Sequence, residues 1–145
     1  MKNILVPVDF SDLSLEVINK AAEIAFAFKS KIWLIHIASL PPAFVGFDMV
    51  SPADQTYQDE DLQQQERELQ LLEKHVQDKG LDARALLVKG LIVDSILEQA
   101  EKVESDLIVM GSHNHGFFYK TFLGSVSEGV MRKSKIPVLI VPEKE

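Results

Sequence analysis

The feature that most constrains the fold of this chain is a regular alternation between short apolar runs and longer segments with helical periodicity. Five short runs are rich in Val, Ile and Leu, as expected for strands that are buried on both faces. Between them, apolar residues recur every three or four positions, as on a helix that packs one side against a sheet. The predicted strands are 3–8, 32–37, 82–89, 107–110 and 138–141, and the predicted helices are 13–28, 62–79, 92–103 and 124–134.

This alternation predicts an α/β fold, because parallel strands need crossover connections and helices supply them. Right-handed crossovers and short connections favour a doubly wound sheet with helices on both faces. We therefore predict a Rossmann-like sheet of five parallel strands in the order 3-2-1-4-5. At 145 residues, the chain 1–145 is expected to form a single domain.

Composition excludes several classes of function. The net charge of −7 argues against nonspecific binding to nucleic acid or to anionic membranes, which requires a basic surface. The absence of cysteine excludes disulfides, thiolate catalysis and cysteine-ligated metal sites. No apolar run approaches the roughly 18 residues of a membrane span, and the first residues lack the apolar stretch of a signal peptide. We therefore expect a cytoplasmic location.

Residues 38–61 show neither strand nor helix periodicity. The segment contains three prolines and a glycine and ends in the acidic run 59–61. Irregular connections of this length usually serve as lids or partner contacts, or are disordered. The apolar residues between 44 and 50 favour partial packing over complete disorder.

The segment 107–126, LIVMGSHNHGFFYKTFLGSV, has the order expected of an anion-binding site. An apolar strand ends at Gly111, a small polar turn follows, and Gly124 and Ser125 precede a predicted helix. Backbone N–H groups at a helix N-terminus can bind a phosphate, and glycine lets the backbone approach it. In a doubly wound sheet, ligands bind beyond the carboxyl ends of the strands where the strand order reverses. This places the expected site between Asp9 and the Gly111 turn.

Other nucleotide-binding designs on this architecture lack their key residues here. The chain has no G-x-x-x-x-G-K-[ST] loop. The turn after the first strand, DFSD, contains no glycine, which excludes a G-x-G-x-x-G fingerprint and a flavodoxin-type phosphate loop at that place. A receiver domain would need an acceptor Asp at the end of the third strand, where the sequence reads VKG.

The chain resembles the universal stress protein family over essentially its full length. The family motif is G-x-x-G, nine residues, then G-[ST]; this sequence has GSHN at 111–114, nine residues, then GS at 124–125. The opening VPVDFS, the strand ending LIHI and the closing IPVLIVP are also similar to that family. The resemblance implies binding of an adenine nucleotide, ATP or AMP, with or without Mg²⁺.

Carried over by position, the resemblance also implies the residues at the ligand. Pro7 and Asp9 would flank the ribose and adenine, and Ile37 would offer its backbone to the adenine. Met110 and Gly111 would lie against the nucleoside. The phosphates would be held by the turn at Asn114 and by the helix start, Gly124, Ser125, Val126 and Ser127. Both serines could donate hydroxyl groups, and the helix start adds backbone N–H groups.

One motif position departs from the family, because Asn114 stands where the second glycine belongs. Asparagine tolerates the left-handed backbone region better than other side chains, so the turn can keep its shape. Its side chain adds bulk where a phosphate would approach. The departure weakens the expectation of tight triphosphate binding more than it weakens the predicted fold.

The histidines and the possible chemistry give weaker signals. His113 and His115 form an H-x-H pair without adjacent acidic or histidine ligands, so we expect no metal site there. His36 lies in an apolar strand, where a buried and hydrogen-bonded histidine is expected. We assign no catalytic residue, since no Lys or Arg precedes Lys120 in the loop; at most slow ATP hydrolysis is expected.

Two functions from different classes remain open beside weak hydrolysis. The first is a stress-response regulator or sensor that binds an adenine nucleotide and forms a homodimer, as the resemblance implies. If the strand 138–141 lies at the sheet edge, its backbone can pair with a second copy. The alternative is an interaction protein of the same fold that binds no nucleotide and acts through its dimer and the 38–61 segment.

Overall fold

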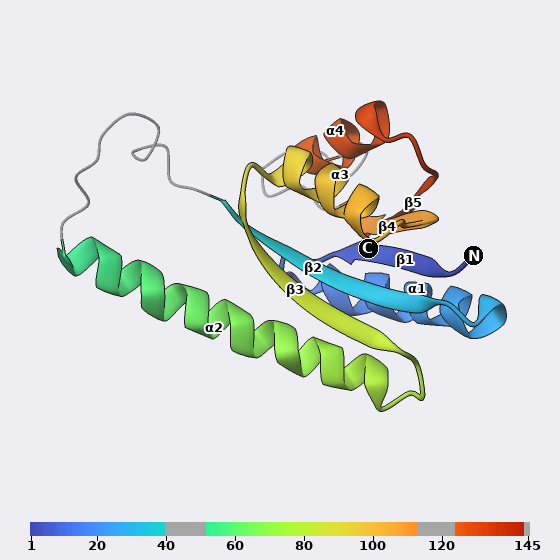
Figure 1. The fold of residues 1–145 in the computed structure, drawn as a ribbon, viewed down its shortest axis with the longest axis horizontal. Helices are drawn as coiled ribbons and strands as arrows, with labels where there is room; N and C mark the ends of the chain where they lie inside the picture. The colour runs from blue at the N-terminus through green and yellow to red at the C-terminus, as the bar shows by residue number, and fades with distance from the viewer. Residues whose placement is uncertain (40–51, 113–123, 144–145) are drawn as a thin grey trace.

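A computed structural model describes residues 1–39, 52–112 and 124–143 of the chain, with the backbone alone for residues 39 and 52–59. The strands form a single five-stranded parallel sheet in the order β3-β2-β1-β4-β5 (Figure 1). They are β1 (Asn3–Pro7), β2 (Lys31–Ser39), β3 (Ala83–Gly90), β4 (Leu107–Gly111) and β5 (Val138–Val141). This confirms the predicted fold class and strand order. The order reverses between β1 and β4.

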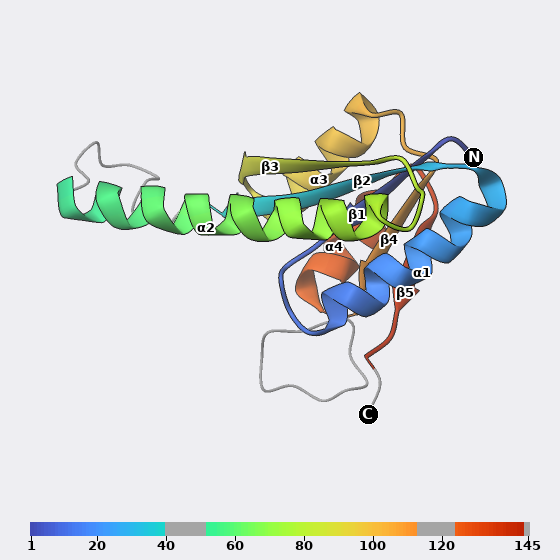
Figure 2. The same cartoon turned by 90° about the horizontal axis from the view of Figure 1, so that it is seen from below.

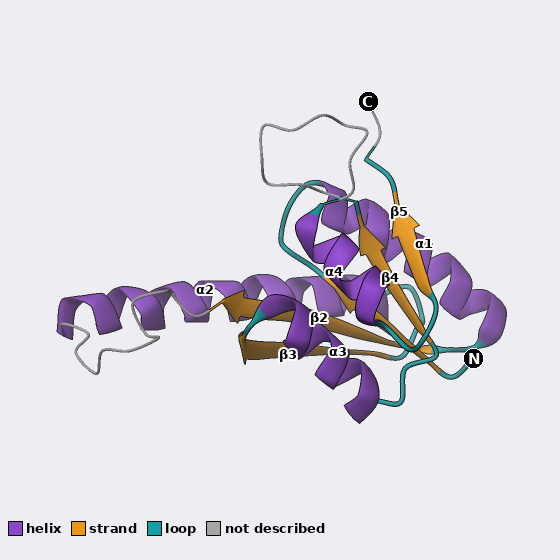
Figure 3. Ribbon diagram, turned by 90° about the horizontal axis from the view of Figure 1, so that it is seen from above, coloured by secondary structure: helices purple, strands orange, loops and turns teal. Residues whose placement is uncertain are grey.

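Four helices connect the strands in the described part of the chain: α1 (Leu13–Phe28), α2 (Pro52–Gln77), α3 (Ile92–Lys102) and α4 (Ser125–Lys133). One face of the sheet is covered by α1 and α2, and the other by α3 and α4 (Figures 2 and 3). This is the two-sided covering expected of a doubly wound sheet.

Each face of the sheet carries its own buried cluster, and alternate residues of one strand contribute to different clusters. In β1, Ile4 and Val6 pack toward α1 and α2, whereas Leu5 packs toward α3 and α4. All three side chains are fully buried. Burying a side chain of this size contributes about 1.5–3 kcal/mol, so the continuous apolar runs supply most of the folding free energy. The two clusters fix the strand register that positions the site.

The prediction that residues 38–61 are irregular is wrong for much of that segment. Residues 38 and 39 belong to β2, and α2 begins at Pro52, well before the predicted start at residue 62. Proline is favoured in the first helical turn because its ring sets a helical φ. The first turns of α2 extend beyond the end of the sheet (Figures 1 and 2). They have no sheet to pack against there, so their sequence carries no apolar periodicity. Residues 40–51 lie outside the described residues.

Asp106 connects the start of β1 to the start of β4 through hydrogen bonds. Its Oδ2 accepts hydrogen bonds from the backbone N–H groups of Lys2 (2.7 Å) and Asn3 (3.0 Å), and its own N–H donates to the Asn3 carbonyl (2.8 Å). The hydrogen bond from Asn3, followed by that from Lys2, lowers the pKa of this carboxyl below its ordinary value. The contact joins the two strands whose other ends form the candidate site.

Replacing Asp106 with asparagine is expected to destabilise the fold in a pH-dependent way. Because the folded-state pKa is lowered, the stabilisation is present above the unfolded pKa and is lost as pH falls through the folded pKa. The effect should be modest, since water screens this exposed group. Urea unfolding across acidic and neutral pH should show a difference from wild type that disappears at low pH, with Asp78→Asn as a surface control. A stability difference that stays constant with pH would show that the ionised Asp106 carboxylate is not its cause.

Candidate functional site

The candidate site lies beyond the carboxyl ends of β1 and β4, where the strand order reverses. The turn from β1 into α1 borders it on one side, and the end of β4 and the start of α4 border it on the other. The topology thus places Asp9, Gly111 and the first turn of α4 at the same edge of the sheet.

The turn after β1 is organised by Asp9. The Asp9 Oδ1 accepts a hydrogen bond from the Ser11 N–H (3.0 Å) and another from the Ser14 hydroxyl in the first turn of α1 (3.1 Å). An Asp that bonds the backbone two residues later is a common turn-forming arrangement. The residue is exposed, so the carboxylate is held in place while its surroundings remain open to solvent. This geometry gives Asp9 a role in the turn and is compatible with the ligand contact predicted for it.

His36 on β2 supports the same turn. Its Nδ1 lies 2.7 Å from the Val8 carbonyl oxygen, and because a carbonyl only accepts, Nδ1 carries the hydrogen. Its ring lies 4.4 Å, centroid to centroid, from the ring of Phe10, whose φ of 62° is unusual for a bulky residue. His36 is hydrogen-bonded as expected, but it is half-buried and not fully buried. Its contact with the turn beside Asp9 could not be predicted from the residue pattern of β2.

A hydrogen bond from Ser127 connects helix α4 to the end of β4. The Ser127 hydroxyl donates a 2.6 Å hydrogen bond to the Gly111 carbonyl oxygen, and the residue is only 2% exposed. Its single hydroxyl hydrogen is therefore committed to β4. Ser125, by contrast, is exposed at the helix start. Of the two serines predicted as hydroxyl donors, Ser125 is the one whose side chain faces solvent.

The first turn of α4 presents backbone donors. Gly124 precedes the helix in an extended conformation, and the first intrahelical bond runs from the Glu128 N–H to the Gly124 carbonyl (2.9 Å). Helix geometry therefore leaves the N–H groups of Ser125, Val126 and Ser127 without intrahelical acceptors. Among the described residues, no side chain caps this end of the helix. Unpaired N–H groups and the positive end of the helix dipole favour an anion at this position.

Gly111 lies where the end of β4 packs closely against α1. A Cβ atom at this position would lie 2.6 Å from Leu13 Cδ2 and 3.2 Å from Val17 Cγ2, both on α1. The end of β4 therefore approaches the start of α1 more closely than any side chain would allow. Gly111 is predicted from the sequence to lie against the nucleoside, but its contact with α1 could not be predicted. A close approach between distant segments leaves no mark in the local sequence pattern.

The other predicted site residues fall into three groups. Ile37 and Met110 are 7% and 4% exposed, with side chains in the cluster under α3 and α4, and Val126 packs against that cluster. Pro7 is half-buried at the end of β1. Ile37 and Met110 could therefore offer a ligand their backbone but not their side chains. Asn114 lies outside the described residues, as do His113 and His115.

The described residues contain neither a metal-binding cluster nor a membrane-spanning helix. Across residues 1–39, 52–112 and 124–143, no group of three or more His, Asp or Glu side chains is arranged to hold a metal ion. Within the same ranges, none of the helices has the length and apolarity needed to cross a membrane.

Comparison with known proteins decides the family. The model of the universal stress protein family matches residues 1–142. The chain belongs to the universal stress protein family. Universal stress protein MJ0531 of Methanocaldococcus jannaschii is 34% identical over 149 aligned residues, covering 99% of this chain and 85% of that relative.

Solved structures agree with this assignment. The structure of protein MJ0577 superposes with a TM-score of 0.81 at 27% identity, covering 99% of this chain and 97% of that one. A universal stress protein in complex with cAMP has a TM-score of 0.70 at 27% identity, covering 97% of this chain and 96% of that one. The universal stress protein fold inferred from the sequence motifs is thus confirmed.

Replacing Ser127 with alanine in this universal stress protein is expected to lower the free energy of unfolding by about 1–2 kcal/mol, because the partly buried Gly111 carbonyl loses a hydrogen-bond partner. Ser125→Ala is the matched control, two residues earlier and exposed, and should stay within about 0.5 kcal/mol of wild type. Equilibrium urea unfolding measures both. Equal effects of the two variants would contradict the role of Ser127.

Proposed function

We propose that this universal stress protein binds an adenine nucleotide, ATP or AMP, between the β1–α1 turn and the first turn of α4. We further propose that it acts as a homodimeric regulator or sensor in the cytoplasmic stress response. The observation that carries the proposal is the start of α4, which no side chain of the described residues caps. The Ser127–Gly111 hydrogen bond holds it against the end of β4, where the strand order reverses.

The two sides of the site suit the two ends of a nucleotide. At the α4 side, the N–H groups of Ser125, Val126 and Ser127 and the Ser125 hydroxyl are donors for phosphate oxygens. At the β1 side, the Asp9 carboxylate is an acceptor for ribose hydroxyls or the adenine amino group. Donors at one end and an acceptor at the other give the ligand a defined orientation.

Backbone groups account for the remaining contacts. Ile37 and Met110 bury their side chains, so they would meet the base and ribose through main-chain atoms, with Pro7 and Gly111 beside them. Asn114 and Gly124 would bracket the phosphates. The cAMP complex of a universal stress protein at 27% identity supports an adenine nucleotide over other anions.

Calorimetric titration with ATP, AMP and cAMP, each with and without Mg²⁺, tests the proposal, with GTP as a control for the base. Saturable heat with the adenine nucleotides and a weaker response to GTP are expected. Absence of heat at millimolar ligand would overturn it. Chromatography of the small molecules released when the purified protein is denatured would identify a nucleotide that stays bound.

The proposed homodimer uses the edge strand β5. This strand is last in the sheet order, and Leu139 at its centre is 37% exposed. Two copies related by a two-fold axis could pair their β5 strands and cover this side chain. Sedimentation equilibrium measures the resulting mass, and a monomer at all concentrations would contradict the dimer.

One observation supports the alternative, an interaction protein of the same fold that binds no nucleotide. The hydroxyl of Ser127 is committed to Gly111, so the start of α4 offers fewer side-chain donors than the motif suggests. If the titrations show no binding while the protein still dimerises, the alternative replaces the nucleotide proposal.

A further inference from the structure

The β3 strand lies at the opposite edge of the sheet from β5, with α2 running beside it (Figure 1). The Asp82 carbonyl accepts a hydrogen bond from the Ile32 N–H of β2 (2.9 Å). Because successive residues of a strand direct their backbone groups to opposite sides, Ala83, Ala85 and Leu87 direct theirs away from β2. This is the row of groups through which an edge strand recruits another strand.

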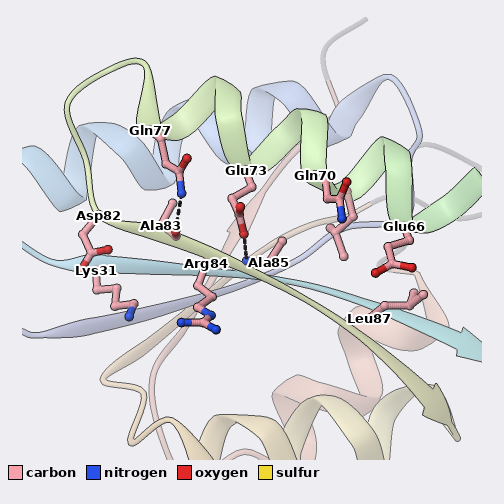
Figure 4. Close-up of a pocket in the computed structure, with 11 residues that line it drawn as sticks. Lys31, Glu66, Gln70, Glu73, Gln77, Asp82, Ala83, Arg84, Ala85 and Leu87 are labelled. Carbon is pink, nitrogen blue, oxygen red and sulfur yellow. Dashed lines mark hydrogen bonds between the residues drawn. The ribbon is translucent and has the colours of Figure 1, made fainter. Parts of the chain in front are cut away.

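Two side chains of α2 already occupy this row (Figure 4). The Glu73 Oε2 accepts a 2.6 Å hydrogen bond from the Ala85 N–H, and the Gln77 Nε2 donates a 3.0 Å hydrogen bond to the Ala83 carbonyl. The two residues are four apart, so they lie on the same side of the helix. Their carboxylate oxygen and amide N–H stand where the C=O and N–H of a neighbouring strand would stand.

Between α2 and β3 lies a groove of about 490 Å³ that continues along the strand from Asp82 to Leu87 (Figure 4). Its α2 side is lined by Glu66 and Gln70 as well as by Glu73 and Gln77. A second strand laid into it would have to displace two intramolecular hydrogen bonds and lie against the carboxylates of Glu66 and Glu73.

We propose that Glu73 and Gln77 shield the β3 edge and thereby prevent a second copy of this chain from pairing with it through its own β3. Two such edges are self-complementary under a two-fold axis, as edge strands in general are. The side chains of Glu73 and Gln77, called the shield below, oppose pairing between two β3 edges in two ways. The shield occupies the groups that the contact needs, and it brings Glu73 of one copy toward Glu73 of the other, where like charges repel.

The test removes the shield with the double substitution Glu73→Ala and Gln77→Ala in the full chain. Sedimentation velocity over a wide concentration range should show a species larger than any that wild type forms at the same concentration. It should appear at a concentration at least about tenfold lower than wild type needs to form it. The matched control is Gln64→Ala with Glu68→Ala. These residues also lie four apart on α2, but their side chains bond each other (3.5 Å) and not the strand. The control should sediment as wild type.

A third substitution tests whether the extra association takes place at the β3 edge. Adding Ala85→Pro to the double variant removes the outward N–H and places a ring on the edge, which blocks strand pairing. The extra association should then disappear. Circular dichroism and a cooperative melt establish that each variant is folded. If the double variant does not fold, Glu73→Leu, which removes the acceptor and keeps a bulky side chain, takes its place.

Two results would overturn the proposal. One is a folded variant without the shield that sediments as wild type at every concentration. The other is extra association that survives Ala85→Pro, since it would then involve a different surface. Neither result depends on nucleotide binding or on the wild-type association state, so this test stands apart from the proposed function.

Discussion

Replacing Gly111 with alanine is expected to lower the free energy of unfolding by about 2 kcal/mol, although the change adds a single methyl group. The added Cβ would lie 2.6 Å from Leu13 Cδ2, 3.2 Å from Leu13 Cγ and 3.2 Å from Val17 Cγ2. Leu13 and Val17 are 6% and 3% exposed, so any shift of their side chains takes place inside the packed core. Forcing extra volume into such a place costs about 1–3 kcal/mol. The melting temperature should fall by about 6 °C for a chain of this size.

Gly129→Ala is the matched control for the alanine substitution. Its Cβ would also meet a side chain closely, at 2.9 Å from Val93 Cγ2. However, Val93 is only half-buried and has room to adjust, and alanine inside a helix gains about 1 kcal/mol over glycine. The two effects should nearly cancel.

A double-mutant cycle locates the cause of the Gly111 effect. In a Leu13→Ala background the side chain that blocks the new methyl group is gone, so Gly111→Ala should cost less than about 0.5 kcal/mol there. An equal cost in both backgrounds would show that the approach of β4 to α1 is not the reason for the glycine. Thermal and urea unfolding of the four proteins complete the cycle.

The fold could be predicted from the sequence because its determinants are local and repeated. The central strands β1 and β4 are continuous apolar runs, since both of their faces are buried, and each helix that packs on the sheet shows an apolar stripe. The start of α2 was missed for the same reason. Where the helix extends beyond the end of the sheet (Figures 1 and 2), it has no sheet to pack against, and its sequence lacks the stripe that reveals a packed helix.

The candidate site was predictable only in outline. The position of Gly111 and of the α4 start followed from their place after β4, which a doubly wound sheet makes a ligand site. The hydrogen bonds that hold the site could not be predicted. Ser127 bonds a residue 16 positions away, and His36 bonds one 28 positions away. Such pairings depend on how two segments meet, and the residue types alone permit many partners.

Asp9 should contribute the largest single share of nucleotide affinity, and its two roles can be separated by substitution. Asp9→Asn keeps the oxygen that accepts from the Ser11 N–H and the Ser14 hydroxyl, so the turn should stay in place. Asp9→Ala removes the acceptor and the charge together. We expect adenine-nucleotide affinity to fall about tenfold in the asparagine variant and by about 10–100-fold in the alanine variant, equivalent to about 1.4–2.7 kcal/mol.

Asp12→Asn is the matched control for Asp9. It lies at the start of α1 and is exposed, and among the described residues its side chain makes no capping hydrogen bond. Its affinity for nucleotide should equal that of wild type. Calorimetric titration measures all three variants, and urea unfolding shows whether a loss of affinity merely follows a loss of stability.

The choice of ligand then tests where on the nucleotide Asp9 acts. If its carboxylate meets the ribose or the base, the loss on substitution should be the same for AMP as for ATP, because the two ligands share that end. If it acts near the phosphates, removing a negative charge should favour ATP over AMP, since ATP carries the greater negative charge. A loss that differs strongly between the two ligands would therefore reverse the orientation proposed for the nucleotide. An asparagine variant that binds like wild type would reduce Asp9 to its role in the turn.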